Sequence, residues 1–143
     1  MKTLVDTCVW SELKLSAPNP LVVSSIRQVE QEDLQLSVIS MGELQKGISL
    51  LPLGRKRAEL DNWFNGLQVR FAEQIVDIDL ETSLIWGELS ARIRLSGNTI
   101  GDADLLIAAS ALRHGFRVMT RNIRDFTPTG VLLVNPWQDD IGE

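Results

Sequence analysis

The chain has 143 residues, of which 44% are hydrophobic and 23% are charged, and its net charge is −5. This length is enough for one core, and no linker-like stretch interrupts it, so we expect a single domain over residues 1–143. The single cysteine excludes an internal disulfide and a cysteine zinc cage. No apolar run reaches the ~18 residues of a membrane span and no signal peptide follows Lys2, so we expect a cytoplasmic protein with no membrane association.

The acidic balance of the chain limits the partners that it can bind through charge alone. Tight, non-specific binding to duplex DNA relies on basic surface that neutralises phosphates, and a net charge of −5 argues against it. A nuclease is still compatible with this charge, because a bound cation offsets the negative charge of a carboxylate cluster.

Strand and helix patterns alternate along the chain. In chain order, the predicted elements are a strand at 2–5, a short helix from about Val9, a helix from Pro20, a strand at 34–39, helices at 40–50 and 55–67, a strand at 74–78, helices at 80–96 and 102–114, and strands at 116–120 and 131–134. Asn19 and Asp79 are predicted N-caps, and Gly115 is predicted to end the 102–114 helix in the C′ position. The 80–96 helix is predicted to have an apolar stripe formed by Leu80, Leu84, Ile85, Leu89 and Ile93.

This alternation predicts an α/β fold with a central, mostly parallel sheet of about five strands and helices on both faces. In such a fold, ligands bind beyond the carboxyl ends of the strands. Residues that follow a strand or begin the next helix lie at that edge. The polar residues in these places are Asp6, Glu43, Asp102, Asp104, Asn122 and Asp125. Acidic groups gathered there, with almost no His or Cys, indicate a site for a divalent metal ion.

Asp6 and Glu43 each have a structural alternative. Asp6 follows a predicted strand and could be a turn carboxylate that accepts from its own backbone. The segment Ser40-Met-Gly-Glu43 matches a capping box, in which Glu43 would accept the N–H of the cap residue Ser40. The capping interpretation also places Glu43 at the sheet edge, so it is compatible with a site.

The later acids also have alternatives. Asp102 is predicted to cap its helix, where the helix dipole favours an acid. Asp104 lies two residues further on and points to another side of the helix, so only one of the two is expected to face the site squarely. A buried Asp104 would need a partner or a metal ion. Asp125 is near Arg121 and Arg124, which would make a surface salt bridge.

Catalysis by a side-chain nucleophile is excluded. Cys8 and His114 are the only candidates for a cysteine–histidine pair. His114 ends the helix that Asp102 begins, roughly 18 Å from the catalytic edge at ~1.5 Å per residue. Because the chain has no other His, a Ser-His-Asp triad and a His-rich zinc site are excluded as well.

Several basic and aromatic residues have two interpretations. The cluster Arg55-Lys56-Arg57 is either a solvated helix start or a nucleic-acid contact. Additional phosphate contacts nearer the site could come from Arg92, Arg94, Arg121 and Arg124. Packing in the core or an interface is favoured over base stacking for Trp10, Trp63, Trp86 and Trp137.

The sequence resembles the PIN-domain nucleases, specifically the toxin ribonucleases of VapBC-type modules and the similar FitB proteins. The resemblance extends over nearly the whole chain. It is carried by the order and spacing of Leu4-Val5-Asp6-Thr7, Ser37-Val-Ile-Ser-Met-Gly-Glu-Leu-Gln-Lys-Gly47, Asp102-Ala-Asp-Leu-Leu-Ile-Ala-Ala109, Thr120-Arg-Asn122 with Asp125-Phe126, and Asn135-Pro136-Trp137.

The resemblance implies metal-binding acids at Asp6, Glu43 and Asp104, with Asp102 as a neighbour that helps to ligate or orients water. Thr120 and Asn122 fall in the segment that often supplies a fourth polar group. Two positions depart from the family pattern. Cys8 stands where Asn or Ser is common, and Asn122 stands where many relatives have Asp, so a second metal ion would need Asp125.

The function that this resemblance implies is metal-dependent hydrolysis of RNA by the toxin of a toxin–antitoxin module. Mg²⁺ or Mn²⁺ is the expected cofactor, since hard cations prefer carboxylate oxygen. The expected partners are an RNA substrate, a VapB-like antitoxin that blocks the acidic edge, and a second copy of the chain in a homodimer.

Two other functions stay open. A phosphotransfer domain of the response-regulator kind also gathers acids at a strand edge, but it needs a Lys at a late strand end, and the chain has no Lys after Lys56. A FitB-like protein would act mainly as the partner of a DNA-binding antitoxin, with little or no nuclease turnover. Metal-dependent cleavage by the purified protein separates this last function from the ribonuclease.

Overall fold

The computed structural model describes residues 1–138, which form a five-stranded parallel sheet with helices on both faces. The strands are β1 (Thr3–Val5), β2 (Leu34–Ser37), β3 (Ile75–Val76), β4 (Arg117–Met119) and β5 (Leu133–Val134). Their order across the sheet is β3-β2-β1-β4-β5, and every neighbouring pair is parallel. The predicted α/β class is therefore confirmed, and β1 lies at the centre with β2 and β4 beside it.

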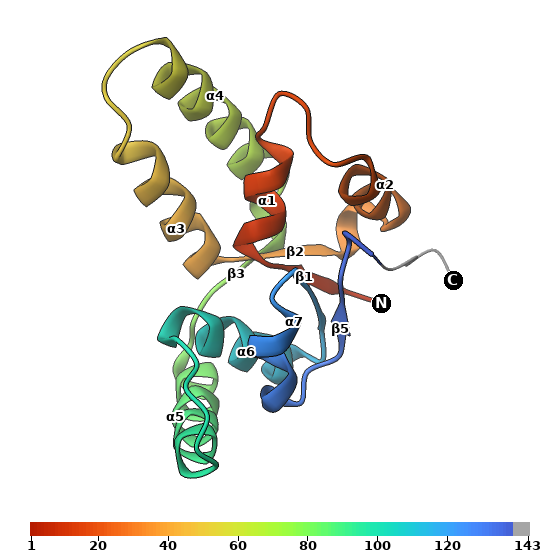
Figure 1. The fold of residues 1–143 in the computed structure, drawn as a ribbon, viewed down its shortest axis with the longest axis vertical. Coiled ribbons are helices and arrows are strands. Elements are labelled where there is room, and N and C mark those ends of the chain that lie inside the picture. Colours follow the sequence, from red (N-terminus) through yellow and green to blue (C-terminus); the bar gives the residue numbers. More distant parts are fainter. Residues whose placement is uncertain (139–143) are drawn as a thin grey trace.

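The helices divide into two groups on opposite sides of the sheet, as Figure 1 shows. The first group is α1 (Thr7–Leu13), α2 (Pro20–Gln28), α3 (Val38–Ser49) and α4 (Arg55–Arg70). The second group is α5 (Leu80–Leu95), α6 (Asp102–His114) and the short α7 (Ile123–Phe126). Three short 3₁₀ turns complete the described elements at Gln31–Asp33, Ala72–Gln74 and Thr127–Thr129.

The two faces of the sheet are packed by alternate residues of the same strands, because successive side chains in a strand point to opposite faces. In β1, Leu4 packs with α5 and α6, whereas Val5 packs with the core formed by the first helix group. Val118 and Met119 divide in the same way in β4. Strands buried on both faces need apolar residues at consecutive positions, and this explains the runs that the sequence shows.

Several predicted caps are confirmed. The side chain of Asn19 accepts the Leu21 N–H at 2.9 Å, and Asp79 accepts the Thr82 N–H at 2.8 Å. Gly115 ends α6 with φ of 71°, a left-handed conformation that glycine adopts without a Cβ penalty.

The predicted capping box at Ser40 is wrong. Strand β2 ends at Ser37, and the side chain of Ser37 accepts the Ile39 N–H at 3.0 Å as the N-cap of α3. The run 34–39, predicted as one strand, thus contains both a strand and the first residues of a helix. Ser40 and Glu43 consequently lie within α3, where both side chains are available for contacts with other elements.

Three further expectations need correction. Helix α1 begins at Thr7 rather than near Val9, because Asp6 accepts the Thr7 N–H and acts as the N-cap. Asp102 is the first residue of α6 and not its cap, a position that Gly101 occupies. In α5, Leu89 and Ile93 are buried as predicted, but Leu80 and Leu84 are 75% and 61% exposed, so the apolar stripe covers only the second half of the helix. None of the described helices has the length and apolar character that a membrane span requires.

Candidate functional site

A cavity of about 460 Å³ opens beyond the carboxyl ends of β1 and β4, next to α1 and α3. It contains four of the residues that the sequence singled out for this edge, namely Asp6, Glu43, Asp104 and Asn122. Its remaining lining residues are Thr7, Cys8, Ser11, Glu12, Leu15, Arg121 and Trp137. Residues from distant parts of the chain thus meet where the parallel strands end, as the topology requires.

Asp6 is the most buried acid of this cavity, with 3% of its surface exposed. It follows β1 directly, and its backbone N–H donates to the carbonyl of Met119 at 2.9 Å, which extends the pairing with β4. Its Oδ1 accepts the Thr7 N–H at 2.8 Å, and its Oδ2 accepts the Thr120 hydroxyl at 2.8 Å. Burial raises the pKa of Asp6, and Glu43 raises it further, while the hydrogen bonds from Thr120, Thr7 and Cys8 act in the opposite direction.

Thr120 joins Asp6 to the segment that follows β4. Its buried hydroxyl donates to Asp6 and also accepts the backbone N–H of Asn122 at 2.9 Å. Asn122 itself is exposed at the cavity, and its side chain makes no cap for α7. Thr120 therefore contributes through Asp6, whereas Asn122 is free to face a ligand.

Glu43 is positioned by α1 and by its own helix. The Thr7 hydroxyl donates to Glu43 Oε1 at 2.7 Å and is within hydrogen-bonding distance of the Ser40 hydroxyl, at 2.8 Å. Ser40 is fully buried, while Glu43 is exposed at the cavity. A chain of hydrogen bonds thus runs from the interior of α3 through α1 to the carboxylate.

Asp104 faces the cavity from the first turn of α6, but its neighbour Asp102 does not line it. Burial raises the pKa of Asp104 to about 6, and the negative charges of Asp6, Asp125 and Glu43 add to this effect. Asp125 lies in α7, outside the cavity lining, yet close enough to influence Asp104. Within residues 1–138, Asp125 forms no salt bridge with Arg121 or Arg124, so the alternative prediction of a surface salt bridge is wrong.

Cys8 is an unsuitable nucleophile. Burial and the negative charge of Asp6 raise the pKa of its thiol to about 11, so the thiol is protonated at neutral pH. The thiol lies 3.6 Å from Asp6 Oδ2 and 3.7 Å from the Thr120 hydroxyl, and it forms part of the wall behind the carboxylate. His114 stacks on Phe116 at the far end of α6, which confirms that no cysteine–histidine pair forms.

The donor set of the cavity suits a hard divalent cation, because its acids supply carboxylate oxygens and few positive charges balance them. Burial is the main cause of the raised pKa values of Asp6 and Asp104, and the negative charges of neighbouring acids raise both further. Residues 1–138 contain no group of three or more His, Cys, Asp or Glu side chains close enough together to coordinate a metal ion in this conformation. The acids surround a common space instead.

Sequence reasoning missed Thr7, Ser40 and Glu12 as residues of this region. Thr7 was present in the motif at Asp6, but its contact with Glu43 joins residues 36 positions apart and has no local signal. Glu12 lines the cavity while its carboxylate accepts the Asn19 N–H at 2.9 Å, so part of its role is to hold the segment before α2. Arg92, considered as a phosphate contact, instead donates to the carbonyl oxygens of Pro128 and Thr129.

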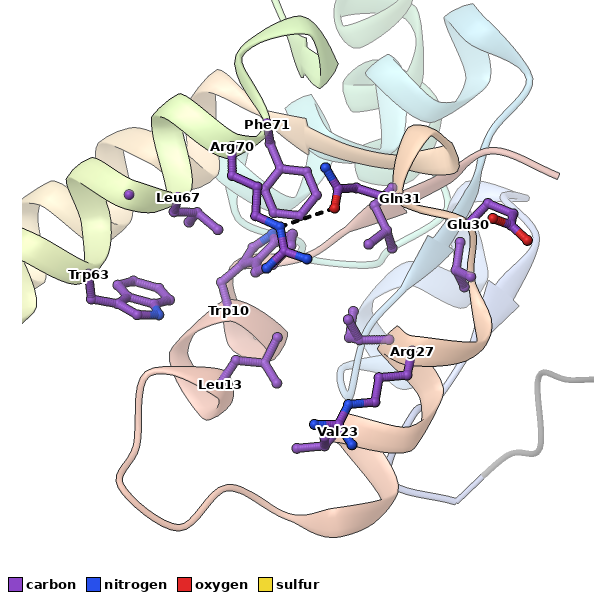
Figure 2. A pocket seen from close by; sticks show the side chains of 14 residues that line it. Trp10, Leu13, Val23, Arg27, Glu30, Gln31, Trp63, Leu67, Arg70 and Phe71 are labelled. Carbon is purple, nitrogen blue, oxygen red and sulfur yellow. Dashed lines mark hydrogen bonds between the residues drawn. The ribbon is translucent and has the colours of Figure 1, made fainter.

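A second, larger cavity of about 770 Å³ lies on the other side of α1 (Figure 2). Trp10 and Leu13 face it from α1, and Trp63 and Leu67 face it from α4. Arg70 donates to the Gln31 side chain at 3.1 Å across one end. This groove is mainly apolar and holds no acidic cluster, so the acids that the sequence singled out for a metal site line the smaller cavity and not this one.

Comparison with known proteins agrees with this architecture. The chain is 36% identical to the VapC ribonuclease Y4jK of Sinorhizobium fredii, over 94% of this chain and 97% of that protein. It is 34% identical to the toxin FitB of Neisseria gonorrhoeae, over 95% and 99% of the two chains. A solved structure of FitAB bound to a DNA fragment contains a chain that superposes with a TM-score of 0.92 at 31% identity, covering 99% of both chains. The PIN domain model matches residues 3–129, and the chain belongs to the PIN domain family.

Proposed function

We propose that this chain is a metal-dependent endoribonuclease that hydrolyses RNA phosphodiester bonds as the toxin of a VapBC-like toxin–antitoxin module in the cytoplasm. The observation that supports this most strongly is the meeting of Asp6, Glu43 and Asp104 around one cavity at the carboxyl edge of the sheet. The similarity to a VapC ribonuclease over almost the full length of both chains supports the same activity.

Mg²⁺ or Mn²⁺ is the proposed cofactor, and Asp6, Glu43 and Asp104 are the residues that would hold it. When bound, such a cation supplies Lewis-acid activation of water and neutralises charge on the phosphoryl oxygens. Asp102 is the first residue of α6, two positions before Asp104, and it lies outside the cavity lining. Its proposed role is limited to orienting water or assisting a neighbouring ligand. Asn122 and Asp125 would contribute to a second ion only if Asp125 turns toward the cavity.

The residues of the chain prepare the site before substrate arrives. Thr120 and the Thr7 N–H hold both oxygens of Asp6, and the Thr7 hydroxyl holds Glu43. These contacts fix two carboxylates from different elements in one orientation, which lowers the reorganisation needed at the moment of reaction. None of the residues that line the cavity is a histidine, so the chain offers no side-chain base of the usual kind for neutral pH.

The test is cleavage of total RNA by the purified chain, in Mg²⁺ or Mn²⁺ and in EDTA. Asp104→Asn is the matched variant, because it keeps the size of the side chain and removes the charge. Discrete products that require the cation and disappear in Asp104→Asn are expected, and the cut ends would identify the target. Products of equal yield in EDTA or in Asp104→Asn would refute the metal-dependent mechanism.

The proposed partner is an antitoxin segment that lies in the apolar groove of Trp10 and Trp63. A groove of this kind accepts the apolar face of an amphipathic helix. Residues of α1 line both the groove and the acidic cavity, so the two lie on opposite sides of one helix. An antitoxin segment that continues from the groove past α1 would reach the carboxylates, where an arginine of the antitoxin would pair with them. A homodimer of the chain is also proposed, and equilibrium sedimentation of the free protein would test it.

A second function follows from the similarity to the FitAB complex on DNA. In this role, the chain would act mainly as the partner of a DNA-binding antitoxin, with little nuclease turnover. Folded protein, free of antitoxin, that binds Mn²⁺ but cleaves no RNA would favour it.

A further inference from the structure

Arg121 occupies an unusual place for a basic residue. Among the described residues that line the acidic cavity, it is the single basic one, and it follows Thr120 directly in the chain. Its guanidinium lies over the ring of Trp137, 4.9 Å from the ring centroid. A guanidinium on an aromatic face is held by attraction to the ring, which needs none of its N–H donors.

Trp137 is attached to well-packed structure. The backbone N–H of Trp137 donates to the Asn135 side chain at 3.0 Å, and the Ser25 hydroxyl donates to the Pro136 carbonyl at 3.4 Å. The Trp137 ring also packs against the core cluster that contains Val5 and Trp10. The ring is therefore a fixed support at the cavity rim, and Arg121 is held in place by it.

The donors of Arg121 are unused within residues 1–138. Its guanidinium makes no hydrogen bond and no salt bridge there, although acids line the same cavity and Asp125 lies four residues away. The residue is exposed, so solvent or a ligand reaches it. A positioned, exposed guanidinium with five free N–H donors is a binding group for phosphate.

We infer that Arg121 binds a backbone phosphate of the RNA substrate next to the scissile one, and that Trp137 is the positioning residue that holds its guanidinium at the cavity. The inference rests on the proposed ribonuclease function. It also explains how RNA approaches a cavity of acids, because a single cation at the rim attracts a phosphate that the carboxylates would repel. One face of Trp137 is covered by Arg121, which favours support of the guanidinium over stacking on a base.

The test measures binding and cleavage of a short, fluorescein-labelled single-stranded RNA by the full chain. Anisotropy in Ca²⁺ gives affinity without relying on turnover, and cleavage in Mn²⁺ gives kcat and KM. The variants are Arg121→Gln, Arg121→Lys and Trp137→Leu, together with the double variant of Arg121→Gln and Trp137→Leu. Lys46→Gln is the control, because Lys46 is an exposed basic residue in the last turn of α3, outside the cavity lining.

Arg121→Gln is expected to weaken RNA binding by roughly tenfold or more, as for the loss of a hydrogen bond to a charged group. The slope of log affinity against log salt should fall by about 0.7, the value for one phosphate contact on a single strand. Arg121→Lys should keep that slope but bind more weakly, since a lysine is a point charge without the stacked fork. Lys46→Gln should match the wild type.

Trp137→Leu should weaken binding in the wild-type background and add nothing in the Arg121→Gln background, because Trp137 acts through Arg121. Equal affinity and salt slope in Arg121→Gln and wild type would overturn the inference. Additive losses would overturn the role of Trp137 and assign its ring to base stacking. If no RNA is cleaved in Mn²⁺ but the salt slope still falls in Arg121→Gln, the proposed nuclease fails while the phosphate contact stands.

Discussion

The hydroxyl of Thr120 lies 2.8 Å from Asp6 Oδ2 and joins the residues that directly follow β4 and β1. The same hydroxyl accepts the Asn122 N–H, so the donor to Asp6 is itself held in one orientation. Asp6 is almost fully buried and carries a raised pKa, and this hydrogen bond is the largest influence that favours its charged form.

Thr120→Val should remove that donor and leave the shape of the side chain nearly unchanged. We expect the free energy of unfolding to fall by about 1–3 kcal/mol, because a buried Asp6 oxygen loses its hydrogen-bond donor and the Asn122 N–H loses its acceptor. RNA cleavage should fall as well, since Asp6 loses its fixed orientation. Denaturant unfolding and cleavage rates measure the two effects. Thr120→Ser is the control, and it should retain most of both.

Asp6 has a structural role and a proposed chemical role, and two substitutions separate them. Asp6→Ala removes the N-cap of α1 and should cost about 1 kcal/mol of stability. Asp6→Asn keeps an oxygen for the Thr7 N–H and should be more stable than Asp6→Ala. Neither variant should cleave RNA, because both lack the carboxylate. Cleavage by Asp6→Asn at the wild-type rate would show that the charge is dispensable.

The hydroxyl of Thr7 should matter for the orientation of Glu43 rather than for the fold alone. In Thr7→Val the hydrogen bond to Glu43 is lost and the buried Ser40 hydroxyl loses its hydrogen-bond partner. We expect weaker Mn²⁺ binding by calorimetry. Thr7→Ser should restore the affinity. If Thr7→Val binds Mn²⁺ as tightly as the wild type, Glu43 needs no support from α1 or is not a ligand.

The stability of the metal-free protein should depend on pH through Asp104. Its pKa is raised from 3.8 to about 6 by burial and by the neighbouring acids, so the folded state binds more protons than the unfolded state between these values. The free energy of unfolding attributable to Asp104 is therefore largest below pH 4, falls as pH rises from about 4 to 6, and then stays constant.

Thermal unfolding in EDTA at several pH values measures this dependence. Asp104→Asn should raise the melting temperature at pH 7 relative to wild type, and the difference should become small near pH 4. Added Mn²⁺ should stabilise the wild type more than Asp104→Asn, because only the wild type keeps this carboxylate. A difference between the two proteins that does not change with pH would contradict the raised pKa.

The fold was largely predictable because its strands are short apolar runs with clear breaks between them. Asn19, Asp79 and Gly115 mark helix ends by local chemistry, and each has the predicted role. The boundary at 34–39 was not predictable, because Ser37 and Ser40 are equally good caps in sequence and only the end of β2 decides between them. The exposure of Leu80 and Leu84 likewise depends on which elements pack against α5, and the sequence pattern of the helix does not indicate this.

The candidate site was predictable in its place but not in its internal contacts. Parallel strands bring Asp6 and Asp104 to one edge whatever the strand order. The strand order sets which residues touch, however, and it puts β4 beside β1 so that Thr120 reaches Asp6. The stacking of Arg121 on Trp137 joins the loop after β4 to the segment after β5, and no local pattern indicates it.

Helix α1 forms the wall between the acidic cavity and the Trp10 groove, and all seven of its residues are buried or half-buried. It has no face that meets only solvent, whereas α4 exposes much of its surface. In a saturation-mutagenesis screen, α1 should therefore tolerate fewer substitutions than any stretch of equal length in α4. Few substitutions in this short helix are expected to be neutral, because each would change the lining of one cavity or the other. Sequence changes in a protein that binds the groove therefore have to stay compatible with an almost unchanged α1.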